Sequence, residues 1–191
     1  MDKLDNIYVA GHNGMVGAAI CRELRRKNYR NLILVNHTDL SLDREDQVEK
    51  FFSENKIDYV FLAAAKVGGI LANKTQGAEF IRDNLKIQTN VIDSAYKFGI
   101  KKFIFLGSSC IYPRDSKQPI KEDYLLSGYL EETNLPYAVA KIAGKVMCDA
   151  YKSQFGFNTL TIMPSNVYGQ GDNFHPENSH VVAGLMRKFH E

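Results

Sequence analysis

The sequence predicts an α/β fold with a doubly wound parallel sheet, and three observations lead to this expectation. Short runs rich in β-branched and aromatic residues alternate with longer amphipathic runs along the 191 residues. A glycine-rich turn follows the first of the β-rich runs, and no repeat or low-complexity tract interrupts the alternation. Strands that alternate with helices form βαβ units, whose crossovers make the strands parallel. The expected strands are Ile7–Ala10, Leu32–Val35, Tyr59–Leu62, Phe103–Leu106 and Thr159–Met163, and the expected helices cover about 14–28, 43–55, 75–98 and 137–155.

Composition and charge are those of an ordinary globular protein. Hydrophobic residues make up 45% of the chain and charged residues 24%, with a formal net charge of +2. These values favour neither a nucleic-acid-binding surface nor a membrane surface. The first residues carry no long apolar run, so we expect no secretory signal and no membrane span. Because Cys21, Cys110 and Cys148 lack paired spacing, we expect no metal site, no disulfide framework and a cytoplasmic location.

The glycine-rich turn has the spacing of a dinucleotide-binding loop. Gly11, Gly14 and Gly17 form GxxGxxG directly after the first strand and at the start of the first helix. Glycines at these positions let backbone N–H groups and the helix N-terminus approach a pyrophosphate. Three glycines can also form an ordinary βα turn, but the strand before them and the helix after them favour a Rossmann-like domain that binds a dinucleotide.

The end of the second strand bears on the choice of cofactor. An acidic residue at this place binds the ribose hydroxyls of NAD, whereas basic residues favour NADP. The sequence reads Asn36-His37-Thr38, with Asp39 as the first acid and no arginine. This pattern favours NADP and leaves NAD possible. Asp39 lies either near the adenine or in a solvated loop.

A second motif, YxxxK, predicts reductase chemistry. Tyr137 and Lys141 are four residues apart, so both side chains emerge on one helix face. An ammonium group beside a phenol favours the phenolate, so we expect a lowered pKa for Tyr137 and a role as proton donor. The alternative is a surface tyrosine beside a solvated lysine. Ser108, at the end of the fourth strand, lies where α/β folds bind ligands, and this placement favours the functional interpretation.

These motifs together resemble the extended short-chain dehydrogenase/reductase family. Several longer segments resemble one branch of it, the GDP-4-keto-6-deoxy-mannose epimerase/reductases, from about residue 7 to the end. They are AGHNGMVG, AAAKVGG, LGSSCIYP, PYAVAKIAG and NVYGQGDNFHPENSHV. The last of these is the most specific, because general family members share only its NVYG.

The resemblance implies an NADPH-dependent enzyme that inverts carbons 3 and 5 of a GDP-linked 4-keto sugar and then reduces carbon 4, giving GDP-L-fucose. It implies that Ser108 and Tyr137 hold the ketone oxygen, that Cys110 removes a proton and that His180 returns one. A nearby cation would make the Cys110 thiolate more available. The alternatives are that Cys110 packs in the interior and that His180 only caps a helix.

The resemblance also implies the remaining site residues. Ser109, Asn166 and Lys188 join Ser108 and His180 as substrate-binding residues, although Lys188 is equally well explained as a solvated side chain. Asn84 ties loops together beside the cofactor. The residues implied for cofactor binding are Gly11, Gly14, Met15, Val16, Gly17, Asp39, Leu40, Ala63, Ala64, Tyr137, Lys141, Pro164, Asn166 and Val167.

Domain organisation and partners complete the expectations. We expect a cofactor-binding domain over 1–174 that carries the catalytic residues, and an incomplete start of a substrate-binding region over 175–191. The C-terminal substrate domain of the family is apparently absent or truncated. Helices near 84–98 and 137–155 would pair in a homodimer, as in the family. Two rival functions remain: a reductase acting on another GDP-linked 4-keto sugar such as a heptose, and a cofactor-binding module without turnover.

Overall fold

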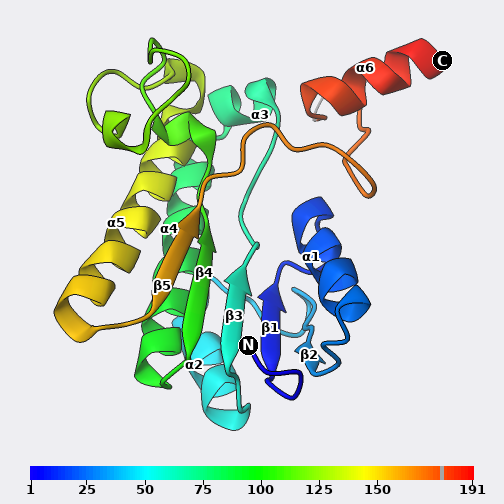
Figure 1. Cartoon of the computed structure of the whole chain (residues 1–191). Helices are drawn as coiled ribbons and strands as arrows, with labels where there is room; N and C mark the ends of the chain where they lie inside the picture. Colours follow the sequence, from blue (N-terminus) through cyan, green and yellow to red (C-terminus); the bar gives the residue numbers. More distant parts are fainter. Residues whose placement is uncertain (177–178) are drawn as a thin grey trace.

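The computed structural model describes residues 1–176 and 179–191 and contains a five-stranded parallel sheet (Figure 1). The strand order is β2-β1-β3-β4-β5, so the order reverses between β1 and β3. In sheets of this kind ligands bind outside the carboxyl ends of the strands, at the point of reversal. The strands are β1 (Ile7–Ala10), β2 (Leu32–Ile33), β3 (Tyr59–Leu62), β4 (Lys102–Leu106) and β5 (Thr159–Ile162).

Helices cover both faces of the sheet, as the alternation of side chains in β1 requires. Tyr8 and Ala10 belong to a core formed with α2, α4 and α5, whereas Ile7 and Val9 pack on the opposite face against Cys21 and its neighbours in α1. The fold is therefore doubly wound, as the sequence predicts. The α-helices are α1 (Met15–Arg26), α2 (Glu45–Glu54), α3 (Ile70–Thr75), α4 (Gly77–Lys97), α5 (Leu135–Phe155) and α6 (Val181–His190).

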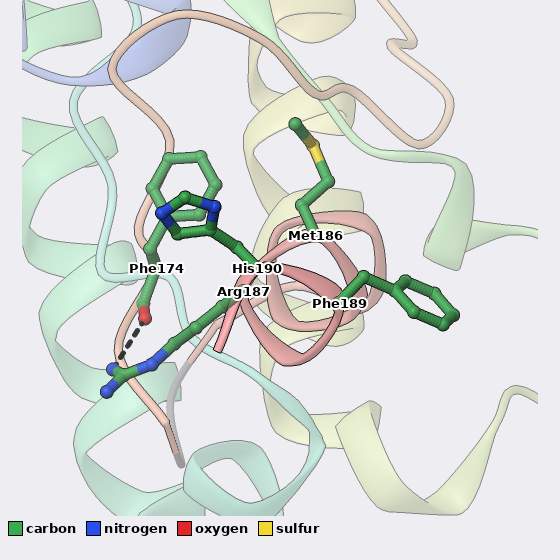
Figure 2. Close-up of a pocket in the computed structure, with 5 residues that line it drawn as sticks. All are labelled: Phe174, Met186, Arg187, Phe189 and His190. Atoms are coloured by element: carbon green, nitrogen blue, oxygen red, sulfur yellow. Dashed lines mark hydrogen bonds between the residues drawn. The ribbon is translucent and has the colours of Figure 1, made fainter.

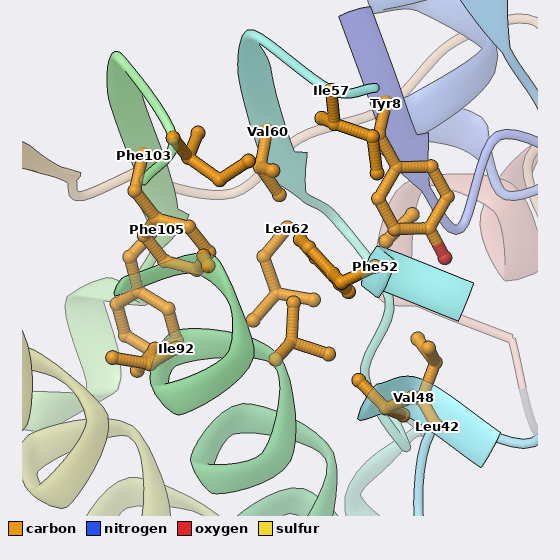
Figure 3. Packing of buried hydrophobic residues seen from close by; sticks show 14 of the residues in the cluster. Tyr8, Leu42, Val48, Phe52, Ile57, Val60, Leu62, Ile92, Phe103 and Phe105 are labelled. Carbon is orange, nitrogen blue, oxygen red and sulfur yellow. The ribbon is translucent and has the colours of Figure 1, made fainter. Parts of the chain in front are cut away.

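The larger core holds the strands and α4 together around aromatic side chains. Figure 3 shows Phe103 and Phe105 of β4 beside Ile92 of α4, with Leu62 of β3 between them and Phe52 of α2. All five side chains are almost fully removed from water. Burying one such side chain contributes about 1.5–3 kcal/mol, so this cluster supplies much of the stability of the sheet.

A close approach of α5 to the sheet positions the chemistry-bearing face of that helix. A Cβ added at Gly144 would lie 2.4 Å from Cζ of Phe105, so only glycine allows this distance. The side-chain amide of Gln88 in α4 donates to the Ala140 carbonyl at 2.7 Å and helps to hold α5 in this place. Lys141 lies on the same buried side of α5 and is only 4% exposed.

The structure differs from the sequence-based elements in three places. Strand β2 has two residues instead of four, because the Asn36 carbonyl accepts hydrogen bonds from the backbone N–H groups of Asp39 and Leu40 and turns the chain away. Helix α3 was not expected. The irregular segment 107–136 contains three short 3-10 turns, η1 (Ser109–Ile111), η2 (Glu122–Tyr124) and η3 (Glu132–Asn134).

One outer edge of the sheet is formed by β5. Leu160 and Ile162 of β5 are 45% and 43% exposed, so this edge of the sheet is only partly covered. Over the described ranges, every helix is too short or too polar to cross a membrane.

Candidate active site

The glycine turn after β1 packs so closely that two of its three glycines have no room for a side chain. Gly11 has a φ of +82°, and a Cβ there would lie 2.6 Å from the backbone nitrogen of Ala64. A Cβ at Gly17 would lie 2.1 Å from the Gly11 carbonyl oxygen. Gly14 is exposed and donates its N–H to that same oxygen at 3.0 Å. The turn thus packs Gly11 against the Ala63–Ala64 backbone and the first turn of α1 against Gly11.

This turn fits the pyrophosphate of a dinucleotide. Helix α1 begins at Met15, and no side chain of the described residues caps its N-terminus. The first N–H groups of a helix have no partner within the helix, and the helix dipole favours an anion there. Met15, Val16 and Gly17 therefore present uncapped backbone donors, which is the donor set that phosphate oxygens require.

Alanine substitutions at two of these glycines should have different effects. Gly17→Ala should lower the free energy of unfolding by roughly 1–3 kcal/mol or more, because overpacking at this contact forces the backbone apart. Gly14→Ala should change that free energy by less than about 1 kcal/mol, because its Cβ would meet its nearest neighbour at 3.4 Å. Urea denaturation measures both, and equal losses in the two variants would contradict the packing described for Gly17.

The loop after β3 is tied down beside the glycine turn by Asn84 of α4. The Asn84 side chain accepts from the Lys66 N–H at 3.0 Å and donates to the Lys66 carbonyl at 2.9 Å. The Lys66 ammonium pairs with Glu79 and, at 3.3 Å, with Asp83. The prediction that Asn84 ties a loop is confirmed, and Ala63 and Ala64 are held next to Gly11 as a result.

Ser108 and Cys110 follow β4 at the same edge of the sheet. Ser108 precedes η1, and its Oγ accepts from the backbone N–H of Cys110 at 3.4 Å. The N–H of Ser109 donates to the Pro164 carbonyl at 3.3 Å, which joins η1 to the segment after β5. Ser108, Ser109 and Cys110 are all half-buried, so they remain accessible to a ligand.

Tyr137 and Lys141 of α5 lie beside this turn, so the structure brings four of the predicted catalytic residues together. The Lys141 ammonium donates to the Leu106 carbonyl at 2.8 Å and lies 5.8 Å from the centre of the Tyr137 ring. The Tyr137 ring packs edge-on against Phe80 at 6.3 Å. Ser108 and Cys110 lie close enough to the Tyr137 hydroxyl to change its pKa.

One expectation about protonation is wrong, and another holds only in part. Burial raises the pKa of Tyr137, although a hydrogen bond with Ser108 lowers it in part, so the expected lowering does not occur. Burial also raises the pKa of the Cys110 thiol. A hydrogen bond with Ser108 and the nearby Lys141 charge both lower this pKa, as expected of a cation, but they do not offset the effect of burial. Sequence spacing gave the neighbours correctly, but the loss of hydration disfavours each charged form more strongly than the neighbours favour it.

Burial lowers the pKa of Lys141 to about 8, from an ordinary 10.5. Between these two pH values the unfolded chain binds more protons at this residue than the folded protein, so the lysine contribution to stability rises with pH. The rise amounts to at most about 3 kcal/mol, at roughly 1.36 kcal/mol per pKa unit. Lys141→Met should lack this rise, and the difference between the unfolding free energies of the two proteins should therefore change by that amount between pH 8 and 10.5.

Lys145→Met is the matched control, because Lys145 lies one turn further along α5 in an ion pair with Asp149. It controls for the loss of one cationic side chain from this helix. A stability curve for Lys141→Met that ran parallel to that of the parent protein would contradict the lowered pKa of Lys141.

At the end of β2, neutral amides meet where the adenosine ribose would lie. The Asn13 amide of the glycine turn donates to the Asn36 side-chain oxygen at 2.9 Å. The Asn36 amide lies 3.5 Å from an Asp39 carboxylate oxygen, and the Thr38 hydroxyl lies 3.3 Å from the other one. Asp39 is exposed, whereas the Leu40 side chain is 5% exposed and belongs to the core. Any cofactor contact of Leu40 is therefore a contact of its backbone.

The remaining predicted residues fall into two groups. Pro164, Asn166 and Val167 follow β5 at the carboxyl edge, and the Pro164 carbonyl accepts from Ser109. His180 and Lys188 belong to the N-cap and body of α6, which lies on the opposite side of Figure 1 from α5. Within the described residues, no hydrogen bond or ion pair links His180 to Cys110.

Asp172 is a neighbour of His180 to which the sequence analysis gave no role. One of its carboxylate oxygens lies 3.5 Å from His180 Nδ1, and its side chain is only 4% exposed. The sequence did place this aspartate in the same specific segment as the histidine, NVYGQGDNFHPENSHV, eight residues before it. An aspartate in a loop is usually solvated, however, and burial cannot be read from the segment alone.

A hollow of about 720 Å³ lies along α6 and not beside the four clustered side chains. Figure 2 shows its lining, including the Arg187 guanidinium, which donates to the Phe174 carbonyl at 3.1 Å. Met186 and Phe189 are 58% and 87% exposed. None of the sequence-predicted site residues lines this hollow, so the candidate active site is assigned from the side-chain cluster. Cys21 and Cys148 are buried, as expected for packing, and the described residues contain no cluster suited to a metal ion.

Comparisons with known proteins agree with this geometry. GDP-L-fucose synthase 1 of Arabidopsis thaliana is 58% identical over 190 residues, covering 100% of this chain and 59% of its own length. GDP-L-fucose synthase of Escherichia coli K12 is 50% identical over 185 residues, covering 97% of this chain and 58% of its own. The structure of a GDP-D-glycero-L-gluco-heptose synthase from Campylobacter jejuni, determined in the presence of NADPH, superposes with a TM-score of 0.96 at 42% identity, covering 100% of this chain and 56% of that one.

The chain thus spans a little over half the length of the relatives that it matches. The family model that describes the NAD dependent epimerase/dehydratase family matches residues 7–191, which is nearly the whole chain. The glycine turn, the strand-end serine and the Tyr137–Lys141 pair all lie inside that match. The chain belongs to the NAD dependent epimerase/dehydratase family.

Proposed function

We propose that the protein converts GDP-4-keto-6-deoxy-D-mannose to GDP-L-fucose by 3,5-epimerisation and NADPH-dependent 4-reduction. The observation that carries this proposal is the meeting of Ser108, Cys110, Tyr137 and Lys141 at the carboxyl edge of the sheet. A tyrosine–lysine pair supports ketone reduction, and a thiol beside the same pair supports proton transfer at a neighbouring carbon. The names of the Arabidopsis and Escherichia coli relatives support the substrate.

In the reduction step, Tyr137 acts as the acid. Its raised pKa keeps the hydroxyl protonated near neutral pH, so it can give a proton to the ketone oxygen as the carbonyl becomes an alcohol. The bound nicotinamide cofactor supplies hydride to carbon 4. Ser108 holds the same oxygen by donating a hydrogen bond. Lys141 stabilises the phenolate that remains and is fixed by its bond to the Leu106 carbonyl.

In the inversion steps, Cys110 acts as the base and His180 as the acid. A proton on a carbon next to a ketone is acidic because the resulting anion delocalises onto the carbonyl oxygen as an enolate. Ser108 and Tyr137 would donate hydrogen bonds to that oxygen and stabilise the charge. In this role the substrate would lie between Cys110 of η1 and His180 at the start of α6.

The proposal is tested by incubating the protein with GDP-4-keto-6-deoxy-D-mannose and NADPH in heavy water. GDP-L-fucose that carries deuterium at carbons 3 and 5 is the expected product. Reduction without deuterium at these carbons would favour the second candidate, a 4-reductase on a GDP-linked heptose, which the Campylobacter structure at TM-score 0.96 supports. Cofactor binding with neither reaction would indicate a binding module without turnover.

We further propose NADP as the cofactor, with NADH also usable. The residues that would hold it are those gathered at the carboxyl edge, and the name of the Campylobacter relative's structure supports NADPH. At the end of β2, however, where the adenosine ribose would lie, Asn13 and Asn36 are neutral and Asp39 is negative. The 2′-phosphate would therefore meet amides and a hydroxyl as donors there. Discrimination between the two cofactors should therefore be small.

Asn13→Arg should make this discrimination large. A hydrogen bond to a charged group contributes about 1.5–3 kcal/mol, so NADPH should bind roughly tenfold or more tightly while NADH changes little. Gln154→Arg, which adds the same charge to the exposed end of α5, is the control. Calorimetric titration with both cofactors measures the effect, which should shrink with added salt. Equal tightening of NADPH and NADH would show that the ribose phosphate does not lie at the end of β2.

We also propose how the chain is divided into domains and how it assembles. Residues 1–174 form the cofactor-binding domain and 175–191 begin a substrate-binding region, where Lys188 meets the nucleotide diphosphate. The protein is cytoplasmic and forms a homodimer through α4 and α5, whose exposed apolar side chains include Tyr96, Val139 and Val146. Sedimentation should give the dimer mass, and Val146→Glu should shift it towards the monomer; a monomeric parent protein would overturn this assembly.

A further inference from the structure

Asp172 and His180 form a pair in which the carboxylate is buried and the imidazole is exposed. Asp172 Oδ1 lies 3.5 Å from His180 Nδ1, and the two side chains are 4% and 47% exposed. The turn before the aspartate contains Gly169 and Gly171, both with positive φ, and the Asp172 N–H donates to the Gly169 carbonyl at 3.2 Å. The turn therefore delivers the carboxylate to one end of the histidine ring.

A buried carboxylate needs partners, because removing its charge from water is costly unless donors replace the water. Asp172 Oδ1 accepts the backbone N–H of Asn173 at 2.7 Å, while Oδ2 is buried and has no hydrogen-bond partner among the described residues. The His180 ring faces this carboxylate through Nδ1. A buried carboxylate that accepts hydrogen bonds favours a proton on the nitrogen that faces it.

The ring nitrogens of a neutral histidine have different roles, since one carries a hydrogen and the other is an acceptor. A hydrogen bond to one nitrogen determines which of them is protonated. The backbone of His180 is fixed independently, because its carbonyl accepts the Gly184 N–H at 2.9 Å at the start of α6. With Nδ1 facing Asp172, Nε2 at the opposite end of the ring is left for a ligand.

We propose that Asp172 is a positioning residue for His180, which holds the proton on Nδ1 and leaves Nε2 to exchange protons with the substrate. This inference rests on the proposed function, in which His180 returns a proton during inversion. In that step the Nε2–H bond breaks, a C–H bond forms at the enolate carbon, and the ring becomes the neutral Nδ1–H tautomer. Water then returns a proton to Nε2, and Asp172 stays a carboxylate throughout.

The test combines Asp172→Asn with His180→Asn. Asparagine keeps the volume of the buried side chain, so a purely structural role would be preserved. Deuterium exchange at carbons 3 and 5 should fall about 10- to 100-fold in Asp172→Asn, the loss seen when a carboxylate that orients a metal-bound histidine is removed. The dissociation constant of NADPH should not change. Asp149→Asn, which alters an exposed carboxylate on α5, is the control and should leave exchange unchanged.

A second readout is independent of activity. Long-range ¹H–¹⁵N correlation spectra of the imidazoles distinguish the two tautomers, and the signals of His180 are assigned by their loss in His180→Asn. The parent protein should show hydrogen on Nδ1, and Asp172→Asn should shift the ring towards the other tautomer.

The outcomes separate the inference from the function on which it rests. If His180→Asn abolishes exchange while Asp172→Asn leaves both exchange and the tautomer unchanged, the positioning role is overturned and the proposed function stands. If His180→Asn leaves exchange intact, the acid role of His180 fails and the positioning role fails with it. Loss of exchange in both variants, with a changed tautomer in Asp172→Asn, supports both.

Discussion

Tyr137→Phe is expected to lower the rate of ketone reduction by about 10²- to 10⁴-fold, the usual contribution of a positioned proton donor. The ring remains, so its edge-on packing against Phe80 should persist and the fold should be unaffected. Exchange at carbons 3 and 5 should fall less than reduction, because Ser108 can still donate to the enolate oxygen. The decrease in NADPH absorbance measures reduction, and the incorporation of deuterium measures exchange.

Tyr151→Phe provides the matched control for this variant. Tyr151 lies on the same helix, but its hydroxyl donates to Asp93 at 2.7 Å, far along α5 from the candidate site. Both reactions should continue in this control at rates near those of the parent protein. Reduction at the parental rate in Tyr137→Phe would remove the acid role of the tyrosine and with it the reductase mechanism proposed above.

Cys110→Ser is expected to separate inversion from reduction. A serine hydroxyl has a far higher pKa than a thiol, so it cannot replace Cys110 as a base, and exchange should fall about 10²- to 10⁴-fold. Reduction should change much less, and a product reduced at carbon 4 without inversion should accumulate. Because burial raises the pKa of the Cys110 thiol, exchange in the parent protein should increase as the pH rises above neutrality and the thiolate fraction grows.

Cys148→Ser is the control for a general effect of replacing a buried thiol. Cys148 is completely buried in the core, and its loss should reduce stability without altering the ratio of inversion to reduction. If Cys110→Ser reduced both reactions equally, or neither, the thiol would have a packing role only.

The grouping of site residues was predictable because two simple rules fix it. Parallel strands end at one edge of the sheet, so Gly11, Ala64 and Ser108 had to meet there once the strands were identified. Helical spacing then placed Tyr137 and Lys141 on one face. Sequence could not give their pKa values, because burial depends on how closely α5 approaches Phe105 across Gly144.

Other features depend on contacts between residues distant in the sequence or on single backbone bonds. Strand β2 is short because one carbonyl, that of Asn36, accepts two backbone N–H groups, and its residue type does not reveal this. Helix α3 has only six residues, too few for a periodic pattern. The Asp172–His180 contact depends on a turn through Gly169 and Gly171, whose course the sequence leaves open.

The bond from the Lys141 ammonium to the Leu106 carbonyl has a mechanical consequence. It joins α5 directly to the strand end that leads to Ser108, so Tyr137, the proposed acid, and Ser108 are held in one unit, where Gly144 packs against Phe105. Thermal motion then displaces both groups together and preserves their spacing. Substitutions that loosen this junction would disturb catalytic alignment and stability at once, so evolution cannot easily adjust one of these properties here without changing the other.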